Sequence, residues 1–320
     1  MANDKFIRLR RCLLLLPALL LAGCSSQGGN FWLFNTKGPS AGASLHYMIL
    51  DVLLMLIVIG PTTVLVIWAM WRYRRNRKAS YAPHWAHSNL IEVVVWSIPV
   101  IIVGVLSYFS YVGTRAVNPY NPTIVTQSAQ ARASKAGPLK VDVITTDWQW
   151  LFVYPQLHIA VTNRLVVPTN RQIQFHLTST SVTNDFYIPQ LVGQIYVMPG
   201  MRTKQSMLVQ SPGKYHGFSA EFSGPGFSWM NYSVDAVSGT QFSSWAKQVR
   251  AGGRQLSYAA FKTFARPTVN TGHKSEYFNR VQPGLFREIV KNVRNGRLAY
   301  KTPMLLTEDM HSKLFHSHTN

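Results

Sequence analysis

Hydrophobic residues dominate two long stretches in the first third of the chain. These stretches run from Leu45 to Trp71 and from Leu90 to Val112. Each exceeds the ~20 apolar residues that an α-helix needs to cross a bilayer. Residues 72–89, between the stretches, contain five basic residues and no acidic residue. Because short basic loops stay in the cytoplasm, we expect a transmembrane helical hairpin with both chain ends on the opposite side.

The pattern of hydrophobic and polar positions changes after the second stretch. Residues 113–137 are rich in Asn, Pro, Ser and Ala and have no periodicity, so we interpret them as a linker. Beyond them, short segments alternate apolar and polar residues between turn residues, for example KVDVITTDWQWLFVY, RQIQFHLTST and MNYSVDAVSG. Such alternation is typical of half-buried strands. We predict a small β-sandwich domain over residues 138–239.

The last quarter of the chain has a different period. The segments FSSWAKQV, YAAFKTFA and GLFREIVKNV place apolar residues three or four positions apart, with basic residues between them. This spacing predicts short amphipathic helices. Residues 240–320 are therefore expected to be a helical extension with a C-terminal tail, and the whole chain is predicted to be a membrane-anchored α+β protein.

The first residues have the pattern of an export signal. A basic start is followed by a short apolar run and by Leu-Ala-Gly-Cys at residues 21–24. We interpret residues 1–23 as a lipoprotein signal peptide, Cys24 as the lipidation site and residues 24–44 as a periplasmic linker. The alternative is an ordinary signal peptide in which the cysteine has no role.

Cysteine usage limits the chemistry of the folded part. The sequence contains 2 cysteines, Cys12 and Cys24. The first lies in the segment that would be removed, and the second would be lipidated. Disulfides, thiolate metal sites and cysteine nucleophiles are therefore excluded from the domains that follow.

The net charge is high and unevenly distributed. The formal charge is +20, and removal of residues 1–23 would take away four basic residues and one acidic residue, leaving +17. Residues 138–240 contain six basic and five acidic residues, whereas residues 241–320 contain thirteen basic and four acidic residues. Such a charge favours anionic lipid or nucleic acid, but an exported protein does not meet nucleic acid.

Four segments, in order, resemble subunit II of the haem–copper respiratory oxidases. They are YAPHWAHSNLIEVVVWSIP, which includes Glu92, Trp96 and Pro99, then TTDWQWLFVYP, SVTNDFYIPQLVGQIYVMPGM and SAEFSGPGFSWM. The first resembles the loop and second helix of that family, and the second resembles the aromatic strand that opens its cupredoxin domain. The last two resemble the segments that hold copper in many members. The resemblance implies a cupredoxin-like fold for the predicted sandwich.

The resemblance also implies that a copper site has been lost. Members that oxidise cytochrome c hold a binuclear copper centre with a histidine and the motif Cys-x-Glu-x-Cys-Gly-x-x-His-x-x-Met. The matching positions here are Asn184, Ser219, Ser223 and Phe227 in place of the histidines and cysteines, with Glu221 and Met230 retained. Hydroxyl groups are poor ligands for such copper. We therefore expect no metal in this chain, and we expect Gly224, Pro225 and Gly226 to form a tight turn while Phe227 fills ligand space.

Loss of this centre is the mark of the quinol-oxidising branch, the cytochrome bo or ba type. The resemblance thus implies a non-catalytic subunit of a proton-pumping ubiquinol oxidase in the bacterial inner membrane. Expected partners are the large subunit I, with its haems and copper, further small membrane subunits, ubiquinol and the lipid bilayer, but neither nucleic acid nor cytochrome c. The alternatives are a copper-containing cytochrome c oxidase subunit, which the missing cysteines oppose, and a free-standing lipoprotein that uses the sandwich for binding or assembly.

One acidic residue in the second apolar stretch has a candidate role. Glu92 lies about one turn inside the expected helix, near its cytoplasmic end, where an ionisable side chain is costly unless it reaches water or a partner. In relatives the matching glutamate lies at the mouth of a proton path into the large subunit. The two interpretations, proton entry and a side chain that only reaches the headgroups, both remain open.

Overall fold

The structure of the protein is a computed structural model that describes residues 32–74, 88–120, 123–131, 137–268 and 274–298. The expected signal peptide, Cys24 and most of the basic loop at residues 72–89 lie outside the described residues. The described part contains the two long helices, the β-domain and most of the C-terminal extension.

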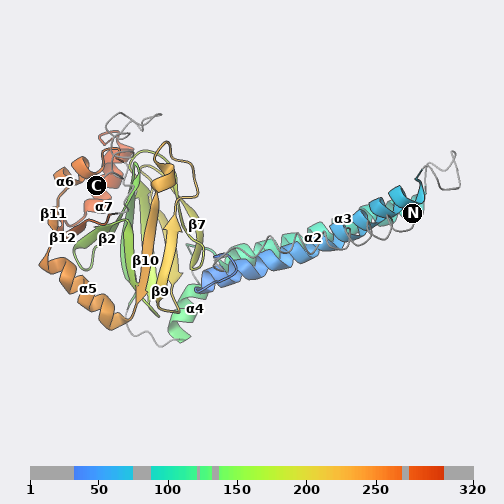
Figure 1. Ribbon diagram of the computed structural model, residues 1–320, viewed down its shortest axis with the longest axis horizontal. Helices are drawn as coiled ribbons and strands as arrows, with labels where there is room; N and C mark the ends of the chain where they lie inside the picture. Colours follow the sequence, from blue (N-terminus) through green and yellow to red (C-terminus); the bar gives the residue numbers. More distant parts are fainter. Residues whose placement is uncertain (1–31, 75–87, 121–122, 132–136, 269–273, 299–320) are drawn as a thin grey trace, which may run out of the picture. The chain divides into compact units, whose positions relative to one another are not determined.

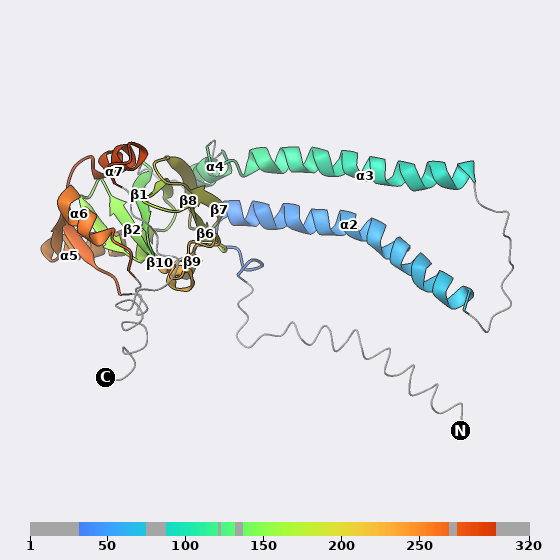
Figure 2. The ribbon, with the colours of Figure 1, turned by 90° about the horizontal axis from the view of Figure 1, so that it is seen from above.

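The two apolar stretches form long helices. Helix α2 spans Pro39–Arg72 and helix α3 spans Asn89–Ala116 (Figures 1 and 2), and both are long and apolar enough to cross a membrane. Their hydrophobic side chains are exposed along most of their length, as lipid-facing side chains would be in the absence of a bilayer. Both helices begin before and end after the predicted spans, and α2 starts with a proline, which is favourable at the first helical position.

The expected linker at residues 113–137 is partly helical, so this prediction was wrong in detail. Helix α3 continues to Ala116, and helix α4 spans Thr123–Ala131. Val125 and Ala129 lie four residues apart and are buried in one cluster with Leu208 of the β-domain. Helical residues four apart share a face, and two small apolar residues were too weak a pattern to predict this contact.

The β-domain is the predicted sandwich. Its strands are β1 (Leu139–Thr146), β2 (Gln149–Tyr154), β3 (Ile159–Thr162), β4 (Arg164–Pro168), β5 (Gln172–Ser179), β6 (Asn184–Ile188), β7 (Val192–Val197), β8 (Thr203–Leu208), β9 (Gly213–Phe218) and β10 (Asn231–Val237). Two further strands, β11 (Arg254–Leu256) and β12 (Tyr277–Val281), follow in the C-terminal extension. Among the described residues, one sheet has the order β11-β12-β3-β2-β1-β5-β8 and the other β4-β10-β9-β6-β7. The two sheets face each other across the main core (Figure 1).

The C-terminal extension contains helices, as predicted, but it also adds two strands. Its elements are α5 (Gly239–Ala251), β11 (Arg254–Leu256), α6 (Tyr258–Phe264), β12 (Tyr277–Val281) and α7 (Leu285–Arg294). Strand β12 pairs with β3, and β11 pairs with β12, so the extension enlarges the first sheet. Helix α5 begins at a capping box formed by Ser238 and Gln241.

Strands β1 and β2 are buried on both faces. Val143, Trp150 and Phe152 point into the core between the sheets. Ile144 and Leu151, on the opposite face, pack with residues of β12, α6 and α7 in a second apolar cluster. Every residue of β2 is buried. The prediction of a half-buried strand was therefore wrong for β2, because the extension forms a third layer over the outer face of this sheet.

Candidate functional site

The segment Ser219–Met230 is the loop that joins β9 to β10, two neighbouring antiparallel strands. The Ser219 N–H donates to the Met230 carbonyl at 3.2 Å, which closes the base of the loop. Gly224 has a φ of +106°, a conformation that favours glycine, and its carbonyl accepts from the Phe227 N–H at 3.0 Å. A short 3-10 helix, Phe227–Trp229, then leads into β10. The structure thus shows the tight turn expected at Gly224–Gly226.

Two buried tryptophans, Trp148 and Trp150, form hydrogen bonds to the backbone of this loop. The indole Nε1 of Trp148 donates to the Ser223 carbonyl at 2.8 Å, and that of Trp150 donates to the Met230 carbonyl at 3.2 Å. A Cβ atom at Gly226 would lie 2.2 Å from the Trp148 ring, so only glycine fits there. The aromatic strand and its turn therefore fix the backbone of the loop by packing and hydrogen bonds.

Two of the positions that the sequence resemblance matched to copper ligands, Asn184 and Ser219, lie in a hydrogen-bonded cluster. The buried Ser219 hydroxyl lies 3.2 Å from the Glu221 carbonyl and 3.5 Å from Asn184 Oδ1, and it accepts from the Asp185 N–H at 3.1 Å. Asn184 Nδ2 donates to the Thr145 hydroxyl at 3.1 Å. The tertiary structure therefore brings Asn184, Ser219 and the Glu221 carbonyl together, although they come from different segments.

The other two positions that the resemblance matched to copper ligands, Ser223 and Phe227, lie further along the same loop. The buried Ser223 hydroxyl lies 3.7 Å from the Met230 sulfur. Phe227 is only partly buried, and its ring centroid lies 5.6 Å from that of Phe222, which is 74% exposed. Phe227 therefore lies at the surface side of the loop, and only part of its ring is buried.

The donor set of this cluster does not fit the binuclear copper centre. An amide, two hydroxyls and a phenyl ring stand where two imidazoles and two bridging thiolates would be needed, and soft copper selects sulfur and imidazole ligands. Within residues 32–74, 88–120, 123–131, 137–268 and 274–298, no group of three or more His, Cys, Asp or Glu side chains is arranged to hold a metal ion.

Asp185 is a feature of the site that sequence reasoning missed. It is 3% exposed, and its Oδ1 atom has no hydrogen-bond partner among the described residues. Burial raises the pKa of Asp185 to about 6, the Glu221 carboxylate adds to this shift, and a hydrogen bond from the Ile195 backbone opposes it. The only sequence signal was an acid directly before the largely apolar stretch FYIP.

The two remaining site candidates, Glu92 and Cys24, lie outside the β-domain in sequence. Glu92 lies in the first turn of α3, and its N–H donates to the Ser88 carbonyl at 3.0 Å. The N-terminus of a helix favours a negative charge, so this position also has a purely structural explanation. Cys24 lies outside the described residues.

Comparison with known proteins identifies the family of both parts of the β-domain. Residues 140–237 match the family model described as cytochrome C oxidase subunit II, periplasmic domain. Residues 250–296 match the model described as COX Aromatic Rich Motif. The second match covers most of the extension that forms the third layer over β1 and β2. Together with the two apolar helices, the periplasmic-type domain indicates an inner membrane protein.

Relatives match nearly the whole length of the chain. It is 38% identical over 303 residues to a ubiquinol oxidase subunit 2 of Acetobacter aceti, covering 94% of each chain. It is 35% identical over 305 residues to a cytochrome bo(3) ubiquinol oxidase subunit 2 of Pseudomonas putida, covering 94% of this chain and 92% of that one. A quinol oxidase subunit 2 of Bacillus cereus is 31% identical over 82% of this chain and 87% of its own length. The chain therefore belongs to the ubiquinol oxidase subunit 2 family.

Proposed function

We propose that this chain is the copper-free subunit II of a proton-pumping complex in which ubiquinol delivers electrons directly to the large subunit and oxygen is reduced to water. The observation that supports this most is the cluster of Asn184, Ser219 and Ser223, which is satisfied by hydrogen bonds and contains neither thiolate nor imidazole. The chain itself takes no part in electron transfer. Its role is to support the complex and to admit protons.

The charge of the β-domain supports the exclusion of cytochrome c as a reductant. Cationic cytochromes c dock on acidic surfaces, and complementary charge governs such encounters. Residues 138–240 are nearly neutral by count and residues 241–320 are strongly basic. A docked cytochrome would also need a redox relay near the surface, and the donor set of the loop offers none.

The proposed partners follow from the same reasoning. The haems and copper of the reaction belong to a large subunit I, which packs with this chain and with further small membrane subunits. The exposed apolar side chains of α2 and α3 provide the surface for lipid and for those partners. A free-standing lipoprotein is the less favoured function, since the relatives that match over 94% of the chain are oxidase subunits.

We further propose that Cys24 carries a lipid and that the β-domain and both chain ends are periplasmic. The lipobox and the basic loop at residues 72–89 support this topology. Radiolabelled fatty acid should be incorporated into the wild-type chain and not into Cys24→Ala. Equal labelling of both chains would contradict the lipid assignment.

The experiment that tests the proposed function uses the complex purified in mild detergent. Oxygen uptake is measured with reduced ubiquinol and with reduced cytochrome c in turn, and copper is measured in the separated subunit. We expect rapid uptake with ubiquinol alone and no stoichiometric copper in this chain. Copper at one or more atoms per chain, or rapid uptake with cytochrome c alone, would overturn the proposal.

A further inference from the structure

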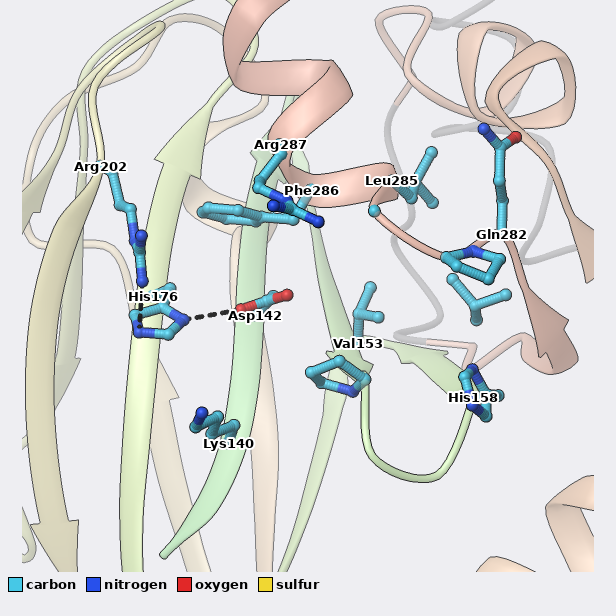
Figure 3. Close-up of a pocket in the computed structure, with 14 residues that line it drawn as sticks. Lys140, Asp142, Val153, His158, His176, Arg202, Gln282, Leu285, Phe286 and Arg287 are labelled. Atoms are coloured by element: carbon cyan, nitrogen blue, oxygen red, sulfur yellow. Dashed lines mark hydrogen bonds and ion pairs between the residues drawn. The ribbon is translucent and has the colours of Figure 1, made fainter.

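A cavity of about 340 Å³ lies beneath the start of helix α7, far in sequence from the β9–β10 loop. Figure 3 shows it between strands β1 and β5 and the turn that enters α7. Part of the cavity wall is apolar and includes Val153, Pro155 and Phe286. Other lining side chains are charged. Its volume is at the lower end of the range for small-ligand sites.

The position of this cavity follows from the third layer of the fold. Lys140 and Asp142 lie on the same face of β1 as Ile144, which α6 and α7 cover. The face becomes polar where α7 begins, and there Asp142 pairs in register with His176 of the parallel neighbour β5. The extension therefore covers the polar part of this sheet face, around Asp142 and His176, and leaves a cavity between itself and the sheet.

Arg202, His176 and Asp142 form a chain of hydrogen bonds at one side of the cavity (Figure 3). Arg202 Nη2 lies 2.7 Å from His176 Nε2, and His176 Nδ1 lies 3.0 Å from Asp142 Oδ1. A guanidinium only donates, so Nε2 must accept and the proton of the neutral ring is on Nδ1, where it donates to the carboxylate. His176 thus holds Arg202 at the cavity without neutralising its charge.

The cavity therefore has an excess of positive charge. Lys140, Arg202 and Arg287 line it, and within the described residues none of them forms an ion pair. Asp142 is the one acidic side chain among the lining residues. The nearby Glu288 is not part of the lining and accepts a hydrogen bond from Gln282 at 2.8 Å.

We propose that this cavity binds an oxyanion, specifically the phosphate group of a small molecule or of a phospholipid headgroup. Arginine forks recognise phosphate oxygens by paired, charge-assisted hydrogen bonds. Figure 3 shows Arg202, Arg287 and Lys140 placed around the Asp142–His176 pair on three sides. The ring of Phe286 and the aliphatic wall accommodate the apolar body to which such a phosphate is attached.

The test uses the full chain in neutral detergent at constant ionic strength, with chloride as the balancing anion. Calorimetric titrations are made with inorganic phosphate and with dihexanoyl phosphatidylglycerol below its micelle concentration. Arg202→Gln and Arg287→Gln each remove one exposed cation without emptying the core. The matched control is Lys291→Gln, which also removes an exposed cation from α7. Lys291 does not line the cavity.

We expect saturable binding to the wild type, weakened about tenfold by either arginine substitution, as loss of one charge-assisted hydrogen bond implies, and unchanged by Lys291→Gln. If inorganic phosphate binds and the two arginine substitutions weaken its binding, the proposal is supported and the natural ligand is a small phosphate compound. The same dependence for the lipid alone would support it with a headgroup as the source. No saturable binding of either probe, or equal weakening by all three substitutions, would overturn it.

Discussion

Asp185 is joined to the β9–β10 loop through its backbone N–H, which donates to the Ser219 hydroxyl, and burial of its carboxyl group raises the pKa of Asp185 to about 6. The usual value for aspartate in an unfolded chain is about 3.9. The folded chain therefore binds this proton more tightly than the unfolded chain does between these two pH values. The contribution of Asp185 to stability is fully present below about pH 4 and is lost as the pH rises to about 6.

Asp185→Asn should remove this loss, because an amide has no proton to release. Compared with the wild type, the variant should lose less stability between pH 4 and pH 6, with a difference of up to about 3 kcal/mol. Denaturant unfolding of the full chain in detergent across this range measures it. Lys214→Gln, at an exposed side chain of β9 that carries no carboxyl group, is the control and should keep the wild-type slope. An Asp185→Asn profile parallel to that of the wild type would contradict the prediction.

At the scale of elements, the C-terminal extension is a structural layer of the sandwich. Ile289 of α7 is fully buried in the cluster that covers Ile144 and Leu151. Without this layer, the outer face of β1 and β2 would expose a contiguous apolar surface, which soluble domains avoid. The extension is therefore needed for the stability of the β-domain itself.

Ile289→Ala should destabilise the β-domain by about 2–5 kcal/mol, the cost of a large-to-small change in a packed core. Thermal unfolding of the full chain in detergent measures the change. Lys291→Ala, two residues further along α7 and exposed, should leave the midpoint nearly unchanged. If both variants unfolded at the wild-type temperature, α7 would not be part of the stabilising layer.

At the scale of the whole molecule, the function depends on a complex that spans the membrane. Glu92 lies at the N-terminal end of α3, which is the cytoplasmic end in the topology that we propose. We propose that it assists proton entry into the large subunit. A titratable group near the membrane surface can pass protons inward, whereas a carboxylate that only caps a helix has no effect on turnover.

Glu92→Gln keeps the shape of the side chain but removes its titration. Quinol oxidation by the purified complex should fall several-fold, while assembly and haem content remain normal. The matched control is Asp51→Asn, an acid in the N-terminal half of the other long helix, which should leave turnover unchanged. Wild-type turnover in Glu92→Gln would leave only the helix-end interpretation.

Features that depend on residue type and on local pattern could be predicted without the structure. The helical hairpin follows from two apolar runs and a basic loop, because length and charge decide insertion without reference to the rest of the fold. The absence of cysteine and histidine at four positions is also fixed by residue type, because no tertiary arrangement turns Asn184, Ser219, Ser223 or Phe227 into a thiolate or an imidazole. The sandwich was also predictable from short alternating segments.

The surfaces that pack against one another could be identified only in the folded chain. Periodicity shows that a strand has an apolar face but not what covers the other face, so the burial of β2 on both sides could not be predicted. The same holds for α4, whose packing rests on Val125 and Ala129. Asp185 and the cavity beside His176 arise where segments far apart in sequence are brought together by long-range strand pairing and helix packing. Burial and charge at such places are properties of the assembled layers, and local sequence does not contain them.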